Sequence, residues 1–216
     1  MPNNSLDLVI TGLGNQPLAY ACFVLARIAQ NKGMDVQILQ PQGEDATAHV
    51  RIAKKAERRT LNQGEASVLL GLDPVAAIKA LPLLSKDGLV VINMPDGLTD
   101  QMLESVFPDV KSPLSLLEGY RVERRDALTA AKEMGLPMAA VTILLGMLSK
   151  HLPFSAYDWQ HAIGSSVPRK VFAANMDAFL SGRGVNKFDP APTLQGSLID
   201  QSETTKKDDE CSETTM

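Results

Sequence analysis

Two glycines that follow a short apolar run are the first residues of this chain whose spacing suggests chemistry. Gly12 and Gly14 stand after the apolar residues 8–10, and Asn15 and Pro17 come directly behind them. Glycine permits a sharp backbone turn, Asn can cap a helix, and Pro suits the first helical turn. A strand that enters a helix through such a loop points backbone N–H groups at the space above the strand end, which favours an anion such as phosphate.

Two other interpretations of this loop stay open. The same spacing is typical of a tight turn beneath a packed helix. A nicotinamide-dependent dehydrogenase is the weaker alternative, because the dinucleotide fingerprint needs a third glycine where Pro17 stands. The fingerprint also needs an acidic residue after the second strand, which we place at 35–39, and that strand is followed by Gln40, Pro41 and Gln42.

The other residue types that could act in catalysis are scattered. His49, His151 and His161 lie far apart and no triad partner is evident, so we expect surface or capping roles for all three. The basic run at 54–59 predicts a solvated turn rather than an anion site. The sequence has no zinc-ligand spacing, no lysine-bearing phosphate loop and no nucleophile elbow. We therefore assign no catalytic residue and no metal ligand, and expect the chemistry to belong to another chain.

The two cysteines are too few to hold an iron–sulfur cluster. Cys22 lies on the apolar face of a predicted helix and Cys211 lies in a polar segment, so a disulfide between them is not expected. Both are predicted to be free thiols, which is typical of a reducing compartment.

Composition excludes several classes of partner. The chain has 216 residues, 44% of them hydrophobic, and a net charge of −4, so no basic field suggests nucleic acid. Its longest apolar stretch, 138–148, is too short to span a bilayer. The chain does not open with a basic and then apolar leader. We therefore expect a cytoplasmic protein that does not bind membranes.

Strand and helix patterns alternate along most of the chain. Buried strands are predicted at 8–10, 35–39, 66–71 and 88–93, and a strand with one wet face at 47–53. Helices are predicted between most of them. Asp73 with Pro74, Asp126 and Ser155 are predicted to begin helices, and Gly182 and Gly184 to end the last one. This alternation favours an α/β fold of three layers: a mostly parallel, Rossmann-like sheet with helices on both faces.

The last third of the chain changes in character twice. Within 137–152, nearly every residue from 138 to 148 is apolar, which predicts a core helix or a helix buried in a subunit interface. From residue 187 the apolar side chains thin out, and such a segment cannot bury enough surface to offset its ordering entropy. We therefore predict one domain over 1–186 and a polar, disordered tail over 187–216.

Several stretches together resemble a known family. They are Gly12, Gly14 and Gln16 in the first loop, the strand at 49–52, the segment 64–74, residues 145–146, and Asn175, Ala178, Phe179 and Gly182 in a last helix. In this order, over about residues 6–184, they resemble the gamma-type domain of the 2-oxoacid:ferredoxin oxidoreductases. The likeness is closest to the beta subunits of indolepyruvate ferredoxin oxidoreductases.

The chain departs from the family pattern at two loops. Asn15 and Pro17 replace two glycines of the first loop. The family carries Gln-Arg-Gly-Gly before the 49–52 strand, whereas this chain has Pro-Gln-Gly-Glu at 41–44. An arginine donor is thereby lost, and Glu44 would repel an anion. The cofactor-binding residues that the resemblance implies here are Gly12, Gly14, Asn15, Gln16 and Gly43.

The resemblance implies a role within a larger enzyme. These enzymes oxidatively decarboxylate a 2-oxoacid to an acyl-coenzyme A and reduce ferredoxin. Thiamine diphosphate and the iron–sulfur clusters lie in a larger partner subunit, and coenzyme A is the candidate ligand of the gamma-type domain. The isolated chain would then be inactive. The altered loops leave a second hypothesis, a degenerate paralogue that acts as a structural or regulatory binding module.

Overall fold

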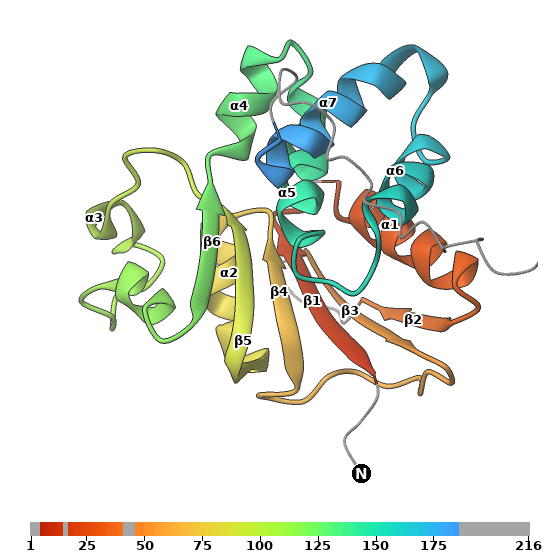
Figure 1. Cartoon of the computed structure of the whole chain (residues 1–216). Coiled ribbons are helices and arrows are strands. Elements are labelled where there is room, and N and C mark those ends of the chain that lie inside the picture. Colours follow the sequence, from red (N-terminus) through yellow and green to blue (C-terminus); the bar gives the residue numbers. More distant parts are fainter. Residues whose placement is uncertain (1–4, 15–16, 41–45, 186–216) are drawn as a thin grey trace, which may run out of the picture.

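Six strands form one mixed sheet at the centre of the molecule (Figure 1). A computed structural model describes residues 5–14, 17–40 and 46–185 of the chain. The strand order across the sheet is β2-β3-β1-β4-β5-β6. The strands are β1 (Leu6–Gly12), β2 (Asp35–Leu39), β3 (Ala46–Ala53), β4 (Ala66–Gly71), β5 (Leu84–Asn93) and β6 (Arg121–Arg125).

The predicted α/β fold is confirmed, with one strand reversed. Strands β1, β4, β5 and β6 pair in parallel, whereas β3 is antiparallel to both β1 and β2. Only residues 40–45 connect β2 to β3. A parallel crossover needs roughly a dozen residues or more, so a connection of this length must turn the chain back on itself.

The prediction that β3 has one wet face is wrong. His49 and Arg51 point to that face, yet their exposed fractions are only 7% and 4%. The Leu61 N–H donates to His49 Nδ1 over 2.8 Å, and Arg51 is ion-paired with Asp7 and Glu65. The residues after β3 therefore cover its polar side chains and satisfy them. The prediction of a surface or capping role for His49 fails for the same reason.

Helices cover both faces of the sheet, as predicted (Figure 1). One face packs against α1, α4, α5, α6 and α7 around Leu8, Ile10 and the fully buried Trp159. The other face packs against α2 and α3 around Val9, Leu69 and Val90. The helices are α1 (Leu18–Asn31), α2 (Pro74–Ala80), α3 (Asp100–Leu103), α4 (Ala127–Glu133), α5 (Ala140–Leu148), α6 (Ala156–Gly164) and α7 (Phe172–Arg183).

The apolar helix α5 belongs to the core of this chain, not to a subunit interface. Every residue from Val141 to Leu148 is buried by the rest of the chain. Its contact with α7 is close, because a Cβ added at Gly146 would lie 2.2 Å from the Phe179 carbonyl oxygen, and one at Gly182 would lie 1.9 Å from that of Ile143. The structure therefore supports the core alternative for residues 141–148, whereas Met138 of the same stretch is 70% exposed. Glycine explains how the two helices approach.

Several predicted helix ends are confirmed. Ser155 and Asp158 form a capping box on α6, and Asp126 caps α4. Gly184 ends α7 in a left-handed conformation. Residues 187–216, predicted to be a disordered tail, lie outside the described residues, so the domain boundary at 186 stays a prediction.

Candidate functional site

At the carboxyl ends of β1 and β4, the glycine loop after β1 lies beside the turn after β4. The Leu72 N–H, just after β4, donates to the Thr11 carbonyl oxygen over 2.8 Å. Gly12 is the last residue of β1, so the glycine loop begins directly beside the turn that leads from β4 into α2. This arrangement is the site at which parallel α/β sheets usually bind ligands.

The glycine loop is described only in part. Gly12 and Gly14 are described, whereas Asn15, Gln16 and Gly43 lie outside the described residues. Neither Gly12 nor Gly14 is among the described glycines with positive φ, and a Cβ at Gly14 would meet no described atom within 4 Å. The described residues around position 14 therefore leave room for a larger side chain. Leu13 between them is 42% exposed.

Helix α1 begins one residue later than predicted. Pro17 occupies the N-cap position, not the first turn, and no side chain of the described residues caps the helix there. The first N–H groups of α1 and the positive end of its dipole are thus directed at the glycine loop. The predicted cap by Asn15 lies outside the described residues.

Asp73, the acidic residue of the second loop, acts as a helix cap. Its carboxylate accepts from the Val75 and Ala76 N–H groups over 2.8 and 3.1 Å, and Pro74 fills the first helical position. Gly71 allows α2 to lie close to the sheet, because an added Cβ would come 2.6 Å from the Ala77 Cβ. The acidic residue and the proline of this motif therefore set the direction of α2.

Two side chains cap α4 at the ends of β5 and β6. The Ala127 and Leu128 N–H groups donate to Asn93 Oδ1 over 2.9 and 3.3 Å, and the Thr129 N–H donates to Asp126 over 2.9 Å. The bond from Thr129 is the largest cause that lowers the pKa of Asp126. Asn93 was not among the residues predicted to be functional, although its place at the end of an apolar strand was a usable signal.

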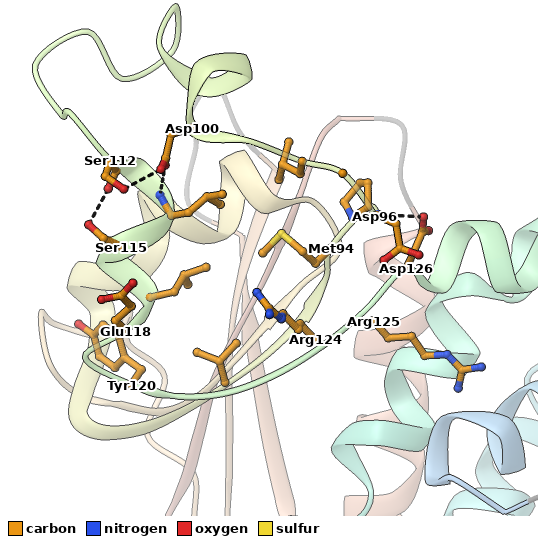
Figure 2. Close-up of a pocket in the computed structure, with 16 residues that line it drawn as sticks. Met94, Asp96, Asp100, Ser112, Ser115, Glu118, Tyr120, Arg124, Arg125 and Asp126 are labelled. Atoms are coloured by element: carbon orange, nitrogen blue, oxygen red, sulfur yellow. Dashed lines mark hydrogen bonds between the residues drawn. The ribbon is translucent and has the colours of Figure 1, made fainter.

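A hollow of about 790 Å³ opens beside these caps, between β6 and the segment 94–120 (Figure 2). Its apolar lining continues the core on the α2 face, since Met94, Leu98, Leu114 and Leu117 belong to that core. The polar residues that line it are Asp96, Asp100, Ser112, Ser115, Glu118, Tyr120, Arg124, Arg125 and Asp126. This volume is in the range that small-molecule sites occupy, roughly 300–1,000 Å³.

Two charged side chains that line the hollow form hydrogen bonds with other residues of the chain. Asp100 accepts from the Ser112 hydroxyl and the Leu114 N–H over 2.7 and 2.8 Å, and the Leu114 bond is the main cause that lowers its pKa. Arg125 turns away and donates to the Ser181 carbonyl and hydroxyl oxygens over 2.6 and 3.0 Å (Figure 2). The bonds to Ser181 direct the Arg125 guanidinium away from the hollow, whereas Asp100 is fixed in position but keeps its negative charge and further acceptor sites.

Arg124 differs from its neighbour Arg125 in the direction of its side chain and in its partners. Because side chains alternate along a strand, Val122 and Arg124 share the face of β6 that lines the hollow. On the other face, Glu123 contacts Lys150 and His151, and Arg125 contacts Ser181 of α7. Within the described residues, the guanidinium of Arg124 and the carboxylates of Asp96 and Glu118 have no hydrogen-bond or ion-pair partner. All three reach the hollow (Figure 2).

The other candidates of the sequence analysis stay apart from this edge. His151 contacts Glu123 and His161 contacts Asn31, and both histidines lie at the surface, as predicted. In the basic run 54–59, which was predicted to be a solvated turn, Arg59 is ion-paired with Glu57 and Glu65. None of these contacts involves a described residue of the glycine loop.

Cysteine chemistry does not fit an iron–sulfur cluster in this chain. Burial raises the pKa of the Cys22 thiol to about 12, so it stays protonated and is a poor metal ligand. Among the described residues, no group of three or more His, Cys, Asp or Glu side chains is placed to hold a metal ion. Over the same residues, no helix has the length and apolar character needed to cross a membrane.

Comparisons with known proteins agree on one family. The profile of the pyruvate ferredoxin/flavodoxin oxidoreductase family matches residues 7–185. The indolepyruvate oxidoreductase subunit IorB of Thermococcus kodakarensis is 29% identical over 189 residues, which are 82% of this chain and 93% of that protein.

Solved structures of the same kind share the fold. The gamma subunit of a keto/oxoacid ferredoxin oxidoreductase from Geobacter sulfurreducens matches with a TM-score of 0.61 and 20% identity, over 82% of this chain and 95% of that one. A 2-oxoglutarate:ferredoxin oxidoreductase from Magnetococcus marinus, solved with 2-oxoglutarate, coenzyme A and succinyl-CoA, matches with a TM-score of 0.65 and 19% identity. That match covers 87% of this chain and 32% of the other, so the fold forms one part of the longer polypeptide.

Proposed function

Because the chain belongs to the pyruvate ferredoxin/flavodoxin oxidoreductase family, we propose that it is the small subunit of a 2-oxoacid:ferredoxin oxidoreductase. The observation that carries the proposal is the match of the family over residues 7–185, nearly all of the described fold. The curated relatives are named as indolepyruvate oxidoreductase subunits, which favours indolepyruvate as the 2-oxoacid.

The reaction that we propose for the complex is oxidative decarboxylation. The 2-oxoacid loses CO₂, its acyl group forms a thioester with coenzyme A, and the released electrons reduce ferredoxin. Thiamine diphosphate and the iron–sulfur clusters are assigned to a larger partner subunit. The two cysteines of this chain support that division, since a cluster usually needs four cysteine ligands.

In this proposal, the chain binds a ligand of the reaction and supplies no catalytic residue. We assign coenzyme A to the edge where β1 and β4 end, with Gly12, Gly14, Asn15, Gln16 and Gly43 as its contacts. The backbone N–H groups at the start of α1 favour the phosphates of this ligand. Asp73 is bound to its own helix and Cys22 is protonated, so neither is assigned a step in the reaction.

The experiment is co-expression of this chain with the large thiamine-dependent, cluster-containing chain that the proposal requires. We expect the two chains to co-purify, and the pair to reduce ferredoxin with indolepyruvate and coenzyme A while this chain alone does not. A large chain that turns over at full rate without this one, or two chains that never associate, would contradict the proposal.

Pro17 favours a second candidate, a family member that keeps the fold as a scaffold or regulatory module and has lost the ligand. Proline removes an N–H group from the start of α1 where the family has glycine. The variants Pro17→Gly and Gln42→Arg distinguish the two candidates. If the site binds coenzyme A weakly, both changes should tighten binding of coenzyme A to the complex. If the chain is only a scaffold, neither change has an effect.

A further inference from the structure

A groove of about 670 Å³ lies between α6 and the start of α7, on the side of the molecule away from α3 (Figure 1). Helix α6 contributes Tyr157, His161 and Gly164 to its lining, and the turn that leads into α7 contributes Arg169 and Phe172. None of the residues assigned in the proposed function lines this groove. Its chemistry is therefore separate from that of the glycine loop.

Three of the side chains that line the groove are aromatic rings. Tyr157 and His161 lie one helical turn apart on α6 and stack, with their ring centroids 6.1 Å apart. The Phe172 ring lies against Gly164, because a Cβ added at this glycine would come 2.7 Å from Phe172 Cε2. Tyr157 and Phe172 are 73% and 43% exposed, so parts of both rings face the solvent. Such rings favour stacking with a planar ligand.

The rings lie within reach of one small molecule. From Tyr157 to Gly164 the distance along α6 is roughly 10 Å, at about 1.5 Å per residue, and the Phe172 ring covers the Gly164 end. Arg169 lies in the short 3-10 helix Arg169–Val171, three residues before Phe172. Side chains three residues apart share one side of such a helix, so Arg169 and Phe172 lie on the same wall of the groove.

The charge of the lining has one sign. Among the described residues that line the groove, Arg169 is the one with a permanent charge, and no Asp or Glu is present. The Arg169 guanidinium has no hydrogen-bond or ion-pair partner within the described part of the chain. Asn31 Nδ2 donates to His161 Nδ1 over 3.3 Å, so Nε2 carries the proton of the neutral ring and is a further donor. The lining therefore favours an anion.

We propose that this groove binds a small aromatic carboxylate. The ligand ring packs against His161 and Phe172, and its carboxylate pairs with the Arg169 guanidinium. Arginine binds a carboxylate through two parallel N–H···O bonds, which fixes the orientation of the ligand as well as its position. The volume of the groove is in the range of small-molecule sites.

Ligands that carry only one of the two features fit less well. An aliphatic anion would pair with Arg169 but leave the rings in water, and a neutral aromatic molecule would leave the guanidinium unpaired. An aromatic amine would bring a second positive charge beside Arg169. The nearest carboxylate of α6, Asp158, does not offset that charge, because it is ion-paired with Lys32 of α1 over 2.9 Å.

The experiment compares three compounds on the full chain by calorimetry or ligand-observed NMR. Indole-3-acetate carries both the ring and the carboxylate, indole-3-ethanol replaces the carboxylate by a hydroxyl group, and acetate lacks the ring. We expect saturable binding of indole-3-acetate, and binding of the other two that is weaker by about tenfold or more, since each loses one set of contacts. Equal binding of indole-3-ethanol, or no saturable binding of indole-3-acetate, would overturn the proposal.

Two variants with matched controls test the residues. Arg169→Gln should weaken binding of indole-3-acetate by about tenfold, whereas Lys170→Gln removes an exposed positive charge from outside the groove and should change it by less than about twofold. Phe172→Leu should weaken binding by about threefold or more, whereas Phe23→Leu, at an exposed ring of α1 outside the groove, should have no effect. Unfolding midpoints show that each variant is folded. Unchanged binding in Arg169→Gln would refute the assignment.

A contact with the large subunit is the alternative occupant of this groove. In that case Arg169→Gln and Phe172→Leu would weaken co-purification of the two chains, and indole-3-acetate would not bind to the free chain. The lack of binding would overturn the proposal.

The result can be separated from the proposed oxidoreductase. Indolepyruvate, the 2-oxoacid favoured above, is itself an aromatic carboxylate, but the site does not rest on that assignment. The binding measurement needs neither the large subunit nor turnover. An active complex whose small subunit does not bind indole-3-acetate would refute only the site, and a chain that binds it but supports no turnover would refute only the oxidoreductase.

Discussion

The amino ends and the carboxyl ends of the parallel strands differ in whether their charged side chains are paired. At the amino ends, Arg51 donates to Asp7 over 2.6 Å and to Glu65 over 2.8 Å, and Arg59 donates to Glu65 as well. At the carboxyl ends, the side chains of Arg124 and Asp96 have no hydrogen-bond or ion-pair partner among the described residues. Charged side chains that are paired within the chain stabilise the fold, whereas charged side chains without a partner are available to a ligand.

The ion pair at the amino ends should give the largest effect. Arg51→Ala leaves Asp7 buried without its counter-ion, so we expect a loss of about 3–5 kcal/mol in the free energy of unfolding. Urea denaturation measures it. Lys54→Ala, at an exposed position nearby, is the control and should change stability by less than about 0.5 kcal/mol. An equal effect of both variants would remove the contrast between the two ends.

Asp73 tests whether a carboxylate at the other end can also be structural. Asp73→Ala removes the acceptor of two helix N–H groups and should cost about 1 kcal/mol, while Asp73→Asn should restore most of it. Asp109→Ala, at an exposed position outside any helix, is the matched control. If Asp73→Ala has no effect on stability, the carboxylate is not needed as a cap and a role in binding becomes the better explanation.

The pH dependence should report the amino-end network. Hydrogen bonds from Arg59 lower the pKa of Glu65 from 4.5 to about 2. A lowered pKa in the folded state stabilises the fold at pH values above 4.5, and this stabilisation is lost as pH falls from 4.5 towards 2. The difference in unfolding free energy between the unchanged chain and Glu65→Gln should therefore shrink over that interval. A difference that stays constant from pH 5 to pH 2 would contradict the network.

The smallest effect on stability is expected at Arg124. Because its guanidinium has no partner among the described residues, Arg124→Gln should change the unfolding free energy by less than about 0.5 kcal/mol. Its neighbour Arg125 is the matched comparison. Arg125→Gln breaks two bonds to Ser181 and should cost about 1.5–3 kcal/mol, the usual value for hydrogen bonds to a charged group. Equal losses in the two variants would show that Arg124 is structural too.

Local patterns predicted much of the fold. Apolar runs located β1, β2, β4 and β5, and the capping residues Ser155, Asp126 and Gly184 marked helix ends that the structure confirms. These predictions succeeded because burial periodicity and capping act between residues a few positions apart. The reversed β3 was also within reach, since the short connection before it excludes a parallel crossover.

The candidate site was predictable only in part. The position of the glycine loop and its neighbour at Asp73 followed from the motifs. The motifs did not predict the covered face of β3, the core position of α5 or the unpaired guanidinium of Arg124. Each depends on contacts between distant residues, such as Arg51 with Asp7 and Arg125 with Ser181.

The sequence by itself determined the order of strands and helices, the family and the lack of cluster ligands, because these depend on residue types and short spacings. Only the tertiary structure decided which charged and polar side chains are paired. The alternation of side chains along β6 predicts that Arg124 and Arg125 lie on opposite faces. It does not predict that Ser181 lies on one face and the hollow on the other. Pairing energy depends on distance in space, and that distance is set by how the whole chain packs.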